Sequence, residues 1–176
     1  MNTDAGWHPM VVHFPLALVV TATLFLLAAR LLRRRSYAAT LATVGTWNLC
    51  LGALAALFSL ATGLAAILHL DVSVAAHQSV SLHLKWAIFT TLALLLLAVW
   101  RGAGGAQESR PSWIFIVVLL AATAALIETG YRGGQNVYRY GVGVRAGAGS
   151  VSDVHPPGSS RGRSRSLGTT VPALVP

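Results

Sequence analysis

The sequence predicts an all-α integral membrane protein: a four-helix bundle with short periplasmic loops and a disordered C-terminal tail. Hydrophobic residues make up 55% of the 176 residues and charged residues only 10%, whereas a typical soluble domain carries about 25% charged residues. Four apolar segments are each long enough to cross a bilayer, whose ~30 Å core takes about 20 helical residues. This composition excludes an ordinary soluble enzyme, a disordered chain and a disulfide scaffold.

The four predicted spans are residues 10–32, 37–70, 84–100 and 113–131. They are unbroken apolar runs rather than alternating ones, so we expect helices and not barrel strands. The second run is long, and Gly63 allows a break near its end. A closing motif at 132–145 completes a membrane domain of residues 1–145. The tail, 146–176, is rich in Gly, Ser, Arg and Pro, and we expect it to be disordered.

Basic residues set the predicted orientation. The net charge is +8, from 13 Lys and Arg against 5 Asp and Glu. Most of the basic residues flank spans, so we expect the lipid bilayer and not a nucleic acid as their partner. Arg30, Arg33, Arg34 and Arg35 follow the first span directly, and such loops stay in the cytoplasm. We therefore expect a multi-pass protein of the bacterial inner membrane, with a retained first span and both termini periplasmic.

Five of the six histidines flank the predicted periplasmic side: His8, His13, His69, His77 and His83. Imidazole is costly in hydrocarbon without a partner, and it is a common ligand of metals and of haem iron. His8 and His13 are about 140° apart on a helical wheel, and His77 and His83 about 120°. Neither pair shares one helix face, so one histidine of span one could face one of span three across the bundle.

We expect His13 and His83 to hold a metal, because they lie nearest the membrane proper, with His8 and His77 as further ligands or supporting groups. Trp86, one turn after His83, could pack on a bound ligand. Histidines at the interface, hydrogen-bonded to water or lipid headgroups, explain the same pattern without any ligand.

Three functions fit these residues. The first is binding of b-type haem for electron transfer, with a periplasmic redox protein or a membrane complex as partner. The second is a non-catalytic accessory or scaffold subunit for a periplasmic partner. The third is a copper or zinc site at the same four histidines. No catalytic constellation is recognisable, so whether the protein is an enzyme stays open, and at most it is a redox carrier.

The remaining candidate residues are structural. Glu128 and Arg132 are spaced for an i,i+4 ion pair. Gly45, Gly52, Ala56 and Gly63 form a stripe of small residues that permits close helix approach. In the closing motif, glycines permit φ > 0, and residues 137–138 and 142–144 suggest short extended pieces. Either a lid over the histidines or a plain surface hairpin would result. The closing-motif glycines are Gly133, Gly134, Gly141 and Gly143.

Two motifs carry a resemblance to a known family. Residues 8–15 are HPMVVHFP, and residues 130–144 are GYRGGQNVYRYGVGV. Together they resemble a bacterial membrane-protein family, the domain of unknown function 2231, over about residues 7–145. The resemblance implies four spans, a Thr-Gly pair late in span two (here Thr62 and Gly63), histidines before span three, and the Val-Tyr step that includes Tyr138. Gln135 and Asn136 depart from the acidic residue and Leu that family members more often carry. The resemblance implies a topology but no reaction.

Overall fold

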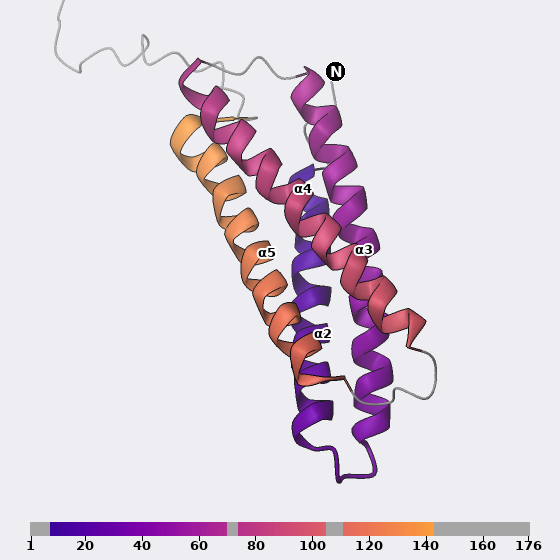
Figure 1. The fold of residues 1–176 in the computed structure, drawn as a ribbon. Helices are drawn as coiled ribbons and strands as arrows, with labels where there is room; N and C mark the ends of the chain where they lie inside the picture. Colours follow the sequence, from indigo (N-terminus) through magenta and orange to yellow (C-terminus); the bar gives the residue numbers. More distant parts are fainter. Residues whose placement is uncertain (1–7, 70–73, 105–110, 143–176) are drawn as a thin grey trace, which may run out of the picture. The chain divides into compact units, whose positions relative to one another are not determined.

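The computed structural model describes residues 8–69, 74–104 and 111–142. Its helices are α1 (His8–Val11), α2 (His13–Leu31), α3 (Ala38–His69), α4 (Val74–Ala103) and α5 (Trp113–Tyr140) (Figure 1). Four spans are long and apolar enough to cross a membrane, α1 and α2 together forming the first. The predicted all-α, four-helix membrane fold is thereby confirmed. The tail at 146–176 and Gly143 lie outside the described residues.

The first span is interrupted between α1 and α2. A proline ring clashes with the carbonyl four residues earlier, and its nitrogen cannot donate to that carbonyl. Pro15 therefore excludes a regular turn at Val11, where α1 ends. The Val12 N–H still donates to the His8 carbonyl at 3.2 Å, so the chain keeps its direction through the break. As a result His8 already belongs to the first span, which runs from His8 to Leu31.

The long helices form a closed ring of four neighbours. Within the described residues, the backbone of α2 lies next to those of α3 and α5, and the backbone of α4 lies next to the same two helices, whereas no Cα atoms of α2 and α4, or of α3 and α5, come within 8 Å of each other. The pairs α2/α4 and α3/α5 thus lie on the two diagonals of the bundle; α4 is in front and α2 behind in Figure 1. Fully buried Leu and Ile side chains from the four helices fill the centre: Leu26, Leu49, Leu94, Ile116 and Leu119.

Glycines of α3 form a continuous seam with α1 and α2, which confirms the predicted stripe. A Cβ atom added to each glycine would overlap the facing side chain: Gly45 with Leu26 Cγ at 2.7 Å, Gly52 with Val19 Cγ2 at 2.8 Å, and Gly63 with His8 Cε1 at 2.7 Å. The two residue numbers in each pair have the same sum, as expected for antiparallel helices in unbroken register. The seam therefore fixes where His8 lies along α3.

The closing motif is largely helical, so the expectation of extended pieces at residues 137–138 and of a folded-back turn was wrong. Helix α5 continues through Gly133, Gly134 and Tyr138 to Tyr140. Polar residues can continue a helix beyond the hydrocarbon, because its backbone bonds are internal. Only Gly141, among the described residues, has a positive φ, of 62°, and it ends the helix as a left-handed glycine cap.

Candidate functional site

His8 lies on the backbone of α3. Its imidazole is half-buried and packs on Gly63, where a side chain would overlap it. Its Nδ1 is 3.1 Å from the Thr62 hydroxyl oxygen. When that hydroxyl donates its proton to the Ser59 carbonyl, 2.9 Å away, it accepts from His8 Nδ1–H. In the neutral ring, Nε2 then carries a free lone pair.

His83 is held in a similar way by α5. Its Nδ1 is 3.1 Å from the Thr129 carbonyl oxygen. A carbonyl only accepts hydrogen bonds, so Nδ1 is the protonated nitrogen and Nε2 again has the free lone pair. The ring packs on Gly133, since a Cβ atom there would lie 3.1 Å from Cε1. The imidazole is half-buried.

The two histidines share one mode of packing. Each ring covers a glycine and lies beside the carbonyl four residues before it: Ser59 for Gly63, and Thr129 for Gly133. In an α-helix that carbonyl accepts from the N–H of the glycine itself. Because glycine has no side chain over this turn, an imidazole can lie directly on the backbone. Gly63 and Gly133 are thus packing sites for imidazole rings within helices and not turn residues.

The four helices bring these groups to one end of the bundle. His8 and His83 lie within electrostatic range of each other, although they come from the diagonal formed by the first span and α4. The other diagonal, α3 and α5, supplies Gly63 and Gly133. We call the set of His8, Thr62, Gly63, His83, Thr129 and Gly133 the histidine site.

The structure pairs the predicted histidines differently from the sequence. His83 comes together with His8, whereas His13 is exposed and its Nδ1 donates to the Pro9 carbonyl at 2.8 Å. His77 is exposed on α4. The choice of His13 depended on depth alone, and the start of the first span at His8 removes that argument.

Hydroxyl groups line the interior around the histidine site. Thr129 and Thr90 are buried, and their hydroxyls are 3.1 Å apart. Ser59 is 7% exposed, and its hydroxyl has no hydrogen-bond partner in the described part of the chain. Sequence reasoning missed these residues, because Ser and Thr inside a span give no signal until the facing helix is known.

Other predicted structural contacts also form near this end. Glu128 and Arg132 make the expected i,i+4 ion pair, at 2.6 Å. Asn136, at a position where the sequence departs from the family pattern, is buried and accepts from the Ser79 hydroxyl at 2.6 Å. Tyr138 is 93% exposed, so it supports no part of the histidine site.

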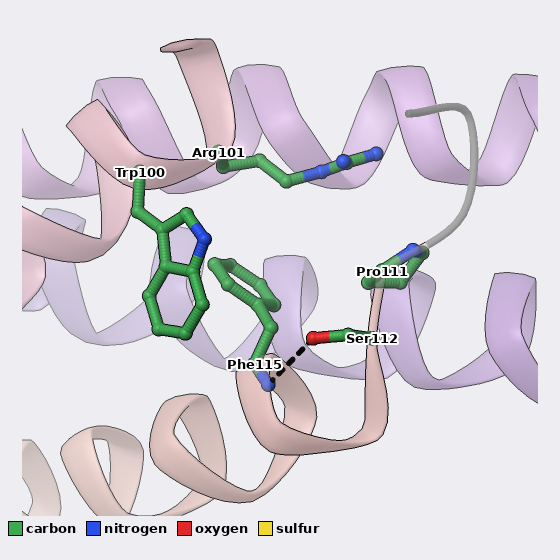
Figure 2. A pocket seen from close by; sticks show the side chains of 5 residues that line it. All are labelled: Trp100, Arg101, Pro111, Ser112 and Phe115. Carbon is green, nitrogen blue, oxygen red and sulfur yellow. Dashed lines mark hydrogen bonds between the residues drawn. The ribbon is translucent and has the colours of Figure 1, made fainter. Parts of the chain in front are cut away.

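A small cavity lies at the opposite end of the bundle (Figure 2). It is lined by Trp100, Arg101, Pro111, Ser112 and Phe115. The Ser112 hydroxyl accepts from the Phe115 N–H at 3.1 Å and caps α5. Arg101 is buried and donates through Nε to the Thr46 hydroxyl at 3.2 Å. These lining side chains include no histidine, cysteine or carboxylate, so the histidine site is the better candidate.

A comparison with known families identifies the family of this chain. The sequence pattern described as "Predicted membrane protein (DUF2231)" matches residues 5–146. The chain belongs to the DUF2231 family. No curated protein and no solved structure matches the chain. In this DUF2231 protein, the opening motif contains His8 and the closing motif contains Gly133. The two motifs that carried the resemblance therefore each contribute a residue to the histidine site.

Proposed function

We propose that this protein binds b-type haem through His8 and His83 and serves as a small membrane electron carrier. The observation that carries the proposal is the repeated seating of the two rings. Each imidazole donates from Nδ1 to a fixed acceptor and leaves the Nε2 lone pair free. Histidines that ligate metals almost always have their second nitrogen anchored in this way, which fixes the tautomer and raises ligand basicity.

Two imidazoles whose Nε2 atoms have no partner among the described residues suit haem better than a bare metal ion. Structural zinc takes four protein ligands and catalytic zinc usually three, whereas haem iron needs only axial ligands from the protein. Within the described ranges, no group of three or more His, Cys, Asp or Glu side chains is placed to hold a metal ion. Binding between the helices of a bundle is also a common way to hold a cofactor.

The protein's own residues would then have three tasks. Thr62 and the Thr129 carbonyl orient the two rings, and Gly63 and Gly133 let the rings approach the backbone. The buried Ser59 hydroxyl offers a polar group to whatever occupies the interior beside His8. Haem supplies one-electron redox chemistry, and the position near one membrane surface suits exchange with a redox protein or membrane complex at that surface.

The test is an optical spectrum of the purified protein after haem-supplemented expression. We expect a sharp α-band on dithionite reduction. His8→Ala and His83→Ala should each remove most of this signal, and the double variant should lose little more, because the two ligands act as a unit. His13→Ala and His77→Ala are matched controls on exposed histidines and should keep the band.

Other outcomes would refute haem binding. Absence of the band in the parent protein would do so, as would small, additive losses for His8→Ala and His83→Ala. Stoichiometric copper or zinc by elemental analysis would favour a metal site instead. Co-purification with one stable partner and no chromophore would favour an accessory subunit.

A further inference from the structure

A groove on the outward side of α4 lies next to the histidine site but is separate from it. It is lined by Leu82, Lys85, Trp86 and Phe89 and measures about 310 Å³. Leu82 and Phe89 are 42% and 63% exposed. The groove is therefore an open apolar surface with one cation at its edge.

Lys85 lacks a counter-charge in the described part of the chain. It is exposed and lies within the apolar span Ala76–Ala103, and no hydrogen bond or ion pair joins it to another described residue. A cation inside a span is costly unless it finds a partner or reaches the interface. A flexible lysine stem can lie along apolar surface while its ammonium extends toward the headgroups.

The wall of the groove is held in place by a charged pair. The Arg132 guanidinium lies 5.4 Å from the centroid of the Trp86 ring and pairs with Glu128 at 2.6 Å. Trp86 in turn meets Phe89 edge to face, with centroids 6.4 Å apart. Because Glu128 neutralises Arg132, Lys85 is, among the described residues that line or border the groove, the one whose charge has no counter-charge.

We propose that this groove binds one anionic phospholipid. Its phosphate pairs with Lys85, and its acyl chain lies on Leu82 and Phe89 against the Trp86 ring. A headgroup with net charge −1 complements the charge of Lys85. A zwitterionic headgroup would place its own ammonium near Lys85 and Arg132. Basic residues at the membrane surface are attracted to anionic lipids in this way. The proposal does not depend on haem binding.

The test uses the full chain in detergent, titrated with phosphatidylglycerol or phosphatidylcholine, with bound lipid counted by native mass spectrometry. We expect preferential retention of phosphatidylglycerol. Lys85→Gln should weaken that retention about fivefold, corresponding to ~1 kcal/mol per basic residue at a membrane surface. Lys85→Arg should preserve it, and Arg33→Gln, which removes one charge from the predicted cytoplasmic loop, is the matched control.

A second variant tests the groove without touching the charge. Leu82→Trp should fill the space for the acyl chain and reduce retention while Lys85 remains. Equal retention of the two lipids by the parent protein would overturn the proposal, and so would unchanged retention in both Lys85→Gln and Leu82→Trp. The redox spectrum of Lys85→Gln should match that of the parent, so failure of this proposal is distinguishable from failure of haem binding.

Discussion

Gly63→Ala tests whether the His8 ring must lie on the backbone of α3. The added Cβ would lie 2.7 Å from His8 Cε1, and ordinary van der Waals contact begins at 3.4 Å, so the ring must retreat by about 0.7 Å. Its hydrogen bond to Thr62, now 3.1 Å long, would then stretch beyond useful length. The substitution therefore affects both the packing and the orientation of the imidazole.

The expected magnitude is a difference between two effects. Replacing glycine by alanine inside a helix stabilises it by roughly 0.5–1 kcal/mol. Overpacking costs about 1–3 kcal/mol, a range that includes the lost hydrogen bond of about 1 kcal/mol. We expect Gly63→Ala to destabilise the protein by up to about 2.5 kcal/mol, with a lower melting temperature in detergent. It should also lose most of the reduced α-band, because the imidazole no longer has the orientation that its bond to Thr62 fixes.

Two other glycines calibrate this experiment. Gly130→Ala on α5 meets nothing within 4 Å, so it should raise the melting temperature and keep the spectrum. Gly133→Ala, with Cβ at 3.1 Å from His83 Cε1, should fall between the two. If Gly63→Ala has the same melting temperature and spectrum as Gly130→Ala, the position of the His8 ring does not depend on Gly63 and the reasoning is refuted.

Three further predictions follow from the packing and the charge pattern. Gly52→Leu should lower the melting temperature, by an overpacking cost of about 1–3 kcal/mol, because a Cβ there already overlaps Val19. Gly102→Leu, in open space, should not lower it. Equal melting temperatures for the two variants would show that the seam between α2 and α3 is not closely packed. Ser112→Ala should lower the free energy of unfolding by about 1 kcal/mol through loss of the α5 cap, whereas Ser112→Asp should keep the parental melting temperature. A parental melting temperature for Ser112→Ala would show that the cap does not stabilise the protein. A reporter fused after Pro176 should show alkaline phosphatase activity, as expected for periplasmic termini, whereas fluorescence of a cytoplasmic reporter there would reverse the topology.

Much of the fold is predictable because the bilayer imposes it. Span number and helix type follow from long apolar runs, since a membrane helix must satisfy its backbone internally. The Glu128–Arg132 pair was predictable from i,i+4 spacing within one helix. The stripe containing Gly45, Gly52 and Gly63 was equally visible, because small residues at regular separations lie on one side of a helix.

The site was harder to predict because it depends on contacts between helices. Depth along the chain favoured His13, but rotation about the helix axis decides which histidine faces inward, and the α3 seam sets that rotation. Gly133 suggested a turn from its residue type, whereas its role is to accommodate the His83 ring. Thr62 was noted only as part of the Thr-Gly pair of the family resemblance, and Thr129 gave no signal, because the hydroxyl and the carbonyl contact an imidazole only once the helices are packed.

The contacts between rings and glycines are divided between the two helical hairpins of the bundle. The N-terminal hairpin, α1 to α3, contains His8 and Gly63, and the C-terminal hairpin, α4 and α5, contains His83 and Gly133. Each hairpin thus carries one complete imidazole-on-glycine contact, and neither carries two. Two copies of one such hairpin, associated as a dimer, would supply the same two imidazoles and two glycines from a chain of half the length. In this chain both contacts belong to one polypeptide, so the residues of one hairpin can be changed without changing those of the other.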